Sequence, residues 1–131
     1  MTTNNTDYKG KILVIEDDDF MRENLVISFQ DSGYEVIEAK DGEDALEKIA
    51  NNGFVAIVSD LFIPSPNGLE LYKTFHSMFP DIPFFIITAF PEQSVAKEAK
   101  ALLGDHFIPK PIAVKKLLQY IKETGRKNEK E

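Results

Sequence analysis

The sequence predicts an α/β fold: a doubly wound, five-stranded parallel sheet with helices on both faces. Short apolar runs rich in Val, Ile and Phe alternate along the whole chain with longer stretches of helical periodicity. The runs are nearly continuous in apolar residues, which is typical of parallel strands covered on both faces. Right-handed crossovers between such strands place the intervening helices on both sides of the sheet.

Five segments carry the strand pattern. The predicted strands are residues 11–15, 34–39, 54–59, 83–87 and 106–108. The second is more polar than the others, which favours a position at the sheet edge, and the third leads directly into Asp60.

The helices are predicted from their caps and stops. Asp19 is the expected N-cap of a helix over 20–32, and Ser32-Gly33 is its stop. Residues 41–44 cap the next helix, which ends at 51–53. Asn67 with Glu70 fits a capping box for a third helix that ends before Pro80.

The last two helices are expected over about 92–103, with Gly104 as the stop, and from Val114 to about Thr124. Apolar residues at three- and four-residue spacing mark the faces that should point inward. These are Met21, Leu25 and Phe29; Ala45, Leu46, Ile49 and Ala50; Leu71, Phe75 and Met78; Val95, Ala99, Leu102 and Leu103; and Val114, Leu117, Leu118 and Ile121.

Composition limits the classes of protein that remain. The chain has 131 residues, which suits one domain, and 43% of them are hydrophobic. No apolar run reaches the ~20 residues that cross a bilayer, and the polar N-terminus is unlike a signal peptide, so a cytoplasmic location with no membrane partner is expected. The absence of cysteine excludes disulfides, thiolate metal sites and thiol catalysis. A net charge of −7 with no basic stripe argues against direct nucleic-acid binding.

Three regions are expected along the chain: a disordered lead-in at 1–10, the folded domain at 11–124, and a solvated tail at 125–131. There is no internal repeat or low-complexity segment.

Polar residues follow four of the predicted strands. Glu16-Asp17, Asp60, Thr88 and Lys110 each stand at a strand's carboxyl end, where open parallel sheets bind their ligands. Three carboxylates close together repel each other, and a divalent cation relieves that repulsion. An all-oxygen, partly hydrated site suits Mg²⁺, or Mn²⁺ in its place. The pattern therefore predicts a cation-and-phosphate site built around an aspartate.

Each of these residues also has an ordinary structural interpretation. Asp60 could be a helix cap or a solvated loop residue, and Glu16 and Asp17 could favour a helix dipole. Lys110 could be a surface lysine, although its position between two prolines makes that segment stiff. Thr88 is a good strand residue in any sheet. The functional interpretation gains weight from the combination of all five.

The chain resembles the receiver domain of two-component response regulators from about Lys11 to Thr124. The motifs that carry the resemblance are Ile-Leu-Val-Ile-Glu-Asp-Asp at 12–18, Asp60 followed by Pro64 and Gly68-Leu69-Glu70-Leu71, Thr88-Ala89, and Lys110-Pro111. One motif alone is weak, but all four in order at this spacing are highly specific. The resemblance implies a (βα)5, flavodoxin-like fold with strand order 2-1-3-4-5.

The resemblance implies a role for each matching residue. Asp60 looks like the phosphoacceptor, which takes a phosphoryl group from a phosphohistidine in a Mg²⁺-dependent reaction. Asp17 looks like a direct Mg²⁺ ligand, Glu16 like a ligand through water, and the backbone carbonyl of Phe62 like a further ligand. Lys110 should pair with Asp60 and then with the acyl phosphate.

The resemblance also implies a switch. Thr88 should swing its hydroxyl onto the phosphate, Phe107 matches an aromatic that changes rotamer with it, and the Lys110–Pro111 bond matches one that is commonly cis. The fourth helix, fifth strand and fifth helix are the hypothesised output face. Two aromatics, Phe62 and Phe90, stand at variable positions beside the phosphoryl group, where they either shield the loop or hinder hydrolysis.

The implied partners are a sensor histidine kinase or a histidine phosphotransfer protein, and a downstream protein target or output domain. The chain is expected to be a monomer or a weak phosphorylation-dependent dimer, and an enzyme only in modifying itself and hydrolysing its own acyl phosphate. Two alternatives stay open: a receiver from a larger regulator with a DNA-binding or enzymatic output domain, and a binding module that works without phosphorylation.

Overall fold

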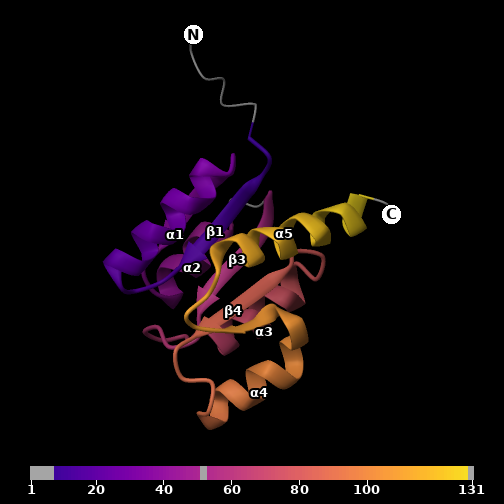
Figure 1. The fold of residues 1–131 in the computed structure, drawn as a ribbon. Coiled ribbons are helices and arrows are strands. Elements are labelled where there is room, and N and C mark those ends of the chain that lie inside the picture. The colour runs from indigo at the N-terminus through magenta and orange to yellow at the C-terminus, as the bar shows by residue number, and fades with distance from the viewer. Residues whose placement is uncertain (1–7, 51–52, 130–131) are drawn as a thin grey trace.

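The computed structural model describes residues 8–50 and 53–129 (Figure 1). It contains one sheet of five parallel strands in the order β2-β1-β3-β4-β5, which confirms the predicted fold class and strand order. The strands are β1 (Lys11–Ile15), β2 (Glu35–Ala39), β3 (Phe54–Asp60), β4 (Phe84–Thr88) and β5 (Phe107–Pro109). The helices are α1 (Asp19–Asp31), α2 (Gly42–Ile49), α3 (Gly68–Met78), α4 (Ser94–Leu103) and α5 (Val114–Glu129), and a 3-10 turn, η2 (Gly104–His106), precedes β5.

The helices cover the sheet in two layers, with α1 and α5 on one face and α2, α3 and α4 on the other (Figure 1). Side chains alternate between the two faces along each strand. In β1, Leu13 and Ile15 enter the core beneath α2, α3 and α4, whereas Ile12 and Val14 enter the core beneath α1 and α5. The central strands are therefore buried on both sides, and the more polar β2 lies at the edge as predicted.

The predicted N-cap of the first helix was wrong, and the start predicted at about residue 92 differs from the structure by two residues. The side chain of Asp18, not of Asp19, caps α1 by accepting a hydrogen bond of 2.9 Å from the Met21 amide. Helix α4 begins at Ser94, two residues later than predicted, because a turn that joins the Gln93 amide to the Phe90 carbonyl precedes it.

The predicted capping box of the third helix is confirmed, whereas the predicted end of the fifth helix came too early. The capping box before α3 is present as predicted, since the Asn67 side chain accepts from the Glu70 amide and the Glu70 side chain accepts from the Asn67 amide. Helix α5 continues to Glu129, beyond the predicted end at Thr124.

Several predicted inward residues are exposed. Leu46, Met78 and Leu102 have exposed fractions of 38%, 54% and 50%, and Ala50 is exposed as well. The reason lies in how each helix sits on the sheet, because only a narrow stripe of a helix meets its neighbours. In α4 that stripe is centred on the fully buried Ala96 and Ala99, which leaves Leu102 at its margin.

The predicted disordered lead-in was too long. The Lys9 amide donates to the Gly33 carbonyl and the Glu35 amide donates to the Gly10 carbonyl, each over 2.9 Å, so this segment is tied to the start of β2. Residues 1–7 of that prediction, and 130–131 of the predicted tail, lie outside the described residues. Over 8–50 and 53–129, no helix combines the length and the apolar character needed to cross a membrane.

Candidate functional site

The carboxyl ends of the strands bring the predicted polar residues together. Asp60 is the last residue of β3, Thr88 is the last of β4, Glu16 follows β1, and Lys110 follows β5. Carboxylate oxygens of Glu16, Asp17 and Asp60 lie within 4.8 Å of one another, the one acidic cluster of this kind in the described part of the chain. The order of the strands explains why these side chains lie close together, because β1, β3 and β4 are neighbours in the sheet.

Lys110 joins two of these carboxylates. Its Nζ lies 3.1 Å from Asp60 Oδ2 and 3.2 Å from Glu16 Oε1. Its backbone amide donates to the Thr88 carbonyl over 2.7 Å, and the Lys110–Pro111 bond is cis, as the resemblance implied. The lysine is therefore held at both its backbone and its ammonium group.

Burial shapes the charges in the site. Glu16 is 1% exposed, and this burial, together with the charge of Asp60, raises the pKa of Glu16 to about 7 despite the nearby ammonium of Lys110. Burial alone would lower the pKa of Lys110, but the charges of Asp60 and Glu16 outweigh it and raise that pKa above its usual value. The site thus has more negative charge than one lysine balances.

The two predicted switch residues are both buried. The Thr88 side chain is 0% exposed, and its Oγ1 accepts a hydrogen bond of 3.0 Å from the Phe90 amide. Phe107 is 7% exposed and packs in the core on the α2–α3–α4 side of the sheet. A movement of the Thr88 hydroxyl toward Asp60 would release the Phe90 amide and so disturb the loop before α4. Their switching roles stay predictions.

An open pocket of about 460 Å³ contains the acidic cluster and Lys110. Phe62 and Phe90 line it with their rings in edge-to-face contact, 5.9 Å between centroids and 75° between planes. The Phe62 amide also donates to Asp60 Oδ1 over 3.3 Å, whereas the predicted ligand role of its carbonyl stays a prediction. Aromatic side chains therefore form one wall of the pocket.

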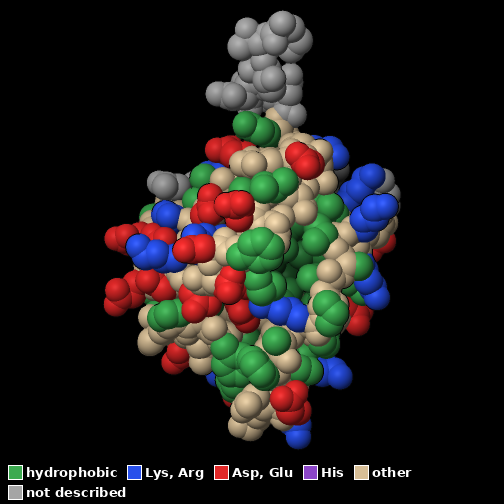
Figure 2. Space-filling view, turned by 60° about the vertical axis from the view of Figure 1, so that its left-hand side comes forward, with side chains coloured by type: hydrophobic (Ala, Val, Ile, Leu, Met, Phe, Trp, Pro, Cys, Tyr) green, Lys and Arg blue, Asp and Glu red, His purple; other side chains and the backbone are tan. Residues whose placement is uncertain are grey.

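A second hollow, of about 480 Å³ and mostly apolar, adjoins the pocket and shares Met21, Ala89 and Lys110 with it. It lies between α1 and the segment that leads into α5, where Leu25, Ile112 and Val114 line it. Figure 2 shows hydrophobic side chains in a hollow near the middle of this face, with acidic side chains gathered beside it.

Comparison with known proteins places this arrangement in a family. The model of the response regulator receiver domain matches residues 12–122. The chain belongs to the response regulator receiver domain family. It is 39% identical over 110 residues to the response regulator MprA of Mycobacterium sp. strain KMS, an alignment that covers 82% of this chain and 47% of that protein. The receiver domain thus spans about half the length of the curated relatives it matches.

Solved receiver structures share the fold. A CheY-like receiver domain protein from Methanospirillum hungatei has a TM-score of 0.82 at 28% identity, with 92% of this chain and 96% of that chain covered. The non-phosphorylated HemR receiver domain from Leptospira biflexa has a TM-score of 0.75 at 30% identity, with 89% and 94% covered.

The donor chemistry of this receiver domain fits a hard divalent cation. Glu16, Asp17 and Asp60 offer only carboxylate oxygens, and the exposed Asp17 leaves room for water in the coordination shell. Mg²⁺ favours such a partly hydrated set of oxygen ligands. A bound cation would also favour the charged form of Glu16, whose pKa is raised without one.

Two residues beside the site were missed in the sequence. Ser59 is fully buried, and its Oγ donates to the Asp60 carbonyl over 2.8 Å. Arg22 donates to the Glu16 carbonyl over 2.7 Å. The three-residue spacing of Asp19 and Arg22 on α1 was the available signal for an ion pair, but the contact with Glu16 depends on how α1 leaves the sheet.

Proposed function

We propose that this receiver domain takes a phosphoryl group from a phosphohistidine of a sensor histidine kinase or histidine phosphotransfer protein onto Asp60. A carboxylate oxygen of Asp60 attacks the phosphorus, the new P–O bond forms as the P–N bond breaks, and the imidazole keeps the electron pair of the broken bond. The observation that carries the proposal is the carboxylate of Asp60 in an open pocket, 3.1 Å from Lys110 and clustered with Glu16 and Asp17.

The arrangement suits phosphoryl transfer because that reaction requires positioning and charge neutralisation more than covalent help. Lys110 can stay close to Asp60 and pair with the oxygens of the new acyl phosphate. Mg²⁺ held by Glu16, Asp17, Asp60 and the Phe62 carbonyl would supply further positive charge, and Mn²⁺ could replace it. The adjoining apolar hollow offers surface for the protein that carries the phosphohistidine.

Phosphorylation then acts as a switch. The acyl phosphate adds roughly two negative charges and strong acceptors, and Thr88 turns its hydroxyl from the Phe90 amide to the phosphate. Phe107 follows into the space that Thr88 leaves, so the face formed by α4, β5 and α5 changes for a downstream target or output domain. The only protein that it chemically modifies is itself. It acts as a cytoplasmic signalling domain that is a monomer, or a weak dimer when it is phosphorylated.

A second form of this function is a receiver within a larger regulator that carries a DNA-binding or enzymatic output domain. The observation that favours it is that the curated relatives are longer than this chain, which aligns with about half of their length. A binding module that works without phosphorylation has less support, because Glu16, Asp17, Asp60, Thr88 and Lys110 are all present.

The experiment is phosphorylation of the purified protein with acetyl phosphate and Mg²⁺. We expect the intact mass to increase by one phosphoryl group, and Asp60→Asn or chelation by EDTA to abolish the increase, because the nucleophile or the cation is lost. Asp105→Asn, an exposed aspartate outside the pocket, serves as the matched control and should leave the modification unchanged. Undiminished labelling of Asp60→Asn would contradict the proposal.

Because Phe62 and Phe90 line the pocket, we expect the acyl phosphate to be hydrolysed slowly. Replacing Phe62 or Phe90 by serine should speed hydrolysis of the acyl phosphate by roughly tenfold, equal to about 1.4 kcal/mol in the barrier, because water gains access to the phosphorus. Decay of the phosphorylated mass after removal of the donor measures this rate. Phe20→Ser, at an exposed aromatic that does not line the pocket, is the control. Equal decay in all these variants would rule out shielding.

A further inference from the structure

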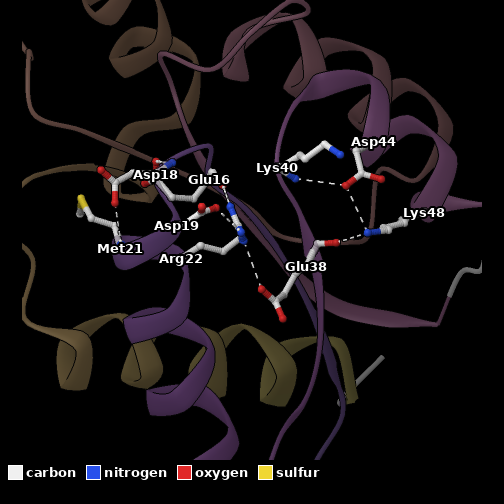
Figure 3. A network of polar contacts seen from close by, with 9 residues as sticks. All are labelled: Glu16, Asp18, Asp19, Met21, Arg22, Glu38, Lys40, Asp44 and Lys48. Carbon is white, nitrogen blue, oxygen red and sulfur yellow. Dashed lines mark hydrogen bonds and ion pairs between the residues drawn. The ribbon is translucent and has the colours of Figure 1, made fainter.

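One arginine on α1 links the acidic loop after β1 to the neighbouring strand. Arg22 donates from Nη1 to the Glu16 carbonyl over 2.7 Å, from Nη2 to Asp19 Oδ1 over 2.6 Å, and from Nε to Glu38 Oε1 over 3.1 Å (Figure 3). Its side chain is only 16% exposed. The guanidinium thus donates from three separate nitrogens of one rigid planar fork, a geometry that the single ammonium nitrogen of a lysine does not reproduce.

The bond to the Glu16 carbonyl bears on two metal-ligand candidates. That carbonyl belongs to the planar peptide unit joining Glu16 to Asp17, and the plane contains both Cα atoms. The Glu16 amide is already held by a bond of 3.0 Å to the Ala39 carbonyl. The amide belongs to the peptide unit before Glu16 and the carbonyl to the unit after it, so the peptide units on both sides of the Glu16 Cα are held. This restricts the direction in which the Glu16 side chain leaves the backbone and the position of the Asp17 Cα.

The guanidinium is itself anchored to the sheet and to α2. Glu38 lies in β2, and its backbone carbonyl accepts a hydrogen bond from Lys48 of α2. Lys48 also pairs with Asp44 at 3.2 Å, and Asp44 accepts from the Lys40 amide. Figure 3 shows this continuous chain of contacts from the acidic loop, through Arg22 and Glu38, to α2.

We propose that Arg22 is a positioning residue that orients Glu16 and Asp17 for a divalent cation. The proposal rests on the proposed Mg²⁺-dependent function and goes further by naming what holds the ligands in place. Mg²⁺ tolerates little deviation from octahedral geometry, so small rotations of this peptide unit weaken its binding. The groups that orient metal ligands commonly affect affinity by about 10- to 100-fold.

The direction of the change in metal affinity distinguishes a positioning role of Arg22 from the effect of its charge. A cationic guanidinium near the acidic cluster repels a metal ion, so loss of its charge alone would strengthen metal binding. Loss of its hydrogen bonds weakens binding, and only this effect persists at high salt, where charge effects are screened.

The test is Mn²⁺ titration of the full, unphosphorylated chain by electron paramagnetic resonance, at low and high salt. Arg22→Gln should raise the dissociation constant by about tenfold at high salt, and by less at low salt, where loss of the positive charge favours the metal. Arg22→Lys, which keeps the charge but not the fork, should also bind Mn²⁺ more weakly than wild type. Lys73→Gln removes one charge from an exposed ion pair with Glu98 and should bind Mn²⁺ as wild type does.

Thermal unfolding shows whether each variant is folded. If Arg22→Gln does not fold, Arg22→Lys alone tests the proposal. Equal or tighter Mn²⁺ binding by Arg22→Gln at high salt, or wild-type affinity in Arg22→Lys, overturns the proposal. If wild type itself binds no Mn²⁺, the proposed cation site fails and the role of Arg22 fails with it. If wild type binds Mn²⁺ and is phosphorylated while the variants match it, only the role of Arg22 is refuted.

Discussion

Lys110→Gln is expected to move metal binding and phosphorylation in opposite directions. The ammonium lies 3.1 Å from Asp60 and 3.2 Å from Glu16, so it competes with a cation for the same carboxylates. Its removal should tighten Mn²⁺ binding. It should also slow phosphorylation by about 10²- to 10³-fold, because one fixed positive charge no longer stabilises the phosphoryl oxygens in the transition state.

The two quantities are measured on the same protein, by Mn²⁺ titration and by the initial rate of phosphorylation from acetyl phosphate. Lys115→Gln removes an equal charge from an exposed position at the start of α5 and is the matched control. A phosphorylation rate close to that of wild type in Lys110→Gln would show that this lysine does not neutralise the phosphoryl group.

Gly68→Ala is expected to damage both stability and phosphorylation, although alanine is the better helix former. A Cβ at Gly68 would lie 2.6 Å from the Asp60 carbonyl oxygen and 2.9 Å from Leu61 Cα. Both atoms belong to the backbone, which cannot rotate away as a side chain would. Overpacking of this kind costs typically 1–3 kcal/mol, which over most of that range exceeds the ~1 kcal/mol that alanine gains in a helix. The strain falls on the backbone of Asp60, so phosphorylation should slow as well.

Chemical denaturation measures the free energy of unfolding, and acetyl phosphate gives the rate of phosphorylation. Ser77→Ala, on the exposed side of the same helix, tests helix propensity without a clash and should leave both quantities near wild type. A Gly68→Ala protein that is as stable and as reactive as wild type would show that the close approach of α3 to β3 is not required.

The order of strands and helices could be predicted because each element carries its own local pattern. The strands contain short apolar runs, and Asn67 with Glu70 marks the start of α3 by bonds within four residues. Local patterns predicted less well which apolar residues are buried. Leu102 fits the spacing of an inward face, yet it is half exposed because Ala96 and Ala99 allow α4 to approach the sheet along another line.

The candidate site also contains some features that could be predicted from the sequence and others that could not. Glu16, Asp17, Asp60, Thr88 and Lys110 could be named in advance, because the carboxyl ends of parallel strands meet at one edge.

The contacts of Arg22 with Glu38 and the fit of Gly68 against Asp60 could not be predicted in the same way. They join residues on different elements at distances that depend on how those elements pack. Their energies change over a few tenths of an ångström, whereas hydrophobic periodicity is insensitive to such shifts.

The amino-acid sequence by itself determined the alternation of strands and helices, the strand ends that carry charge, and the family to which the chain belongs. Only the tertiary structure decided which groups orient the carboxylates, which aromatic rings wall the pocket, and where glycine is sterically required. The physical reason is range: periodicity and capping act within a few residues of the chain, whereas hydrogen bonds and steric contacts in the site join residues that meet only after the sheet has formed.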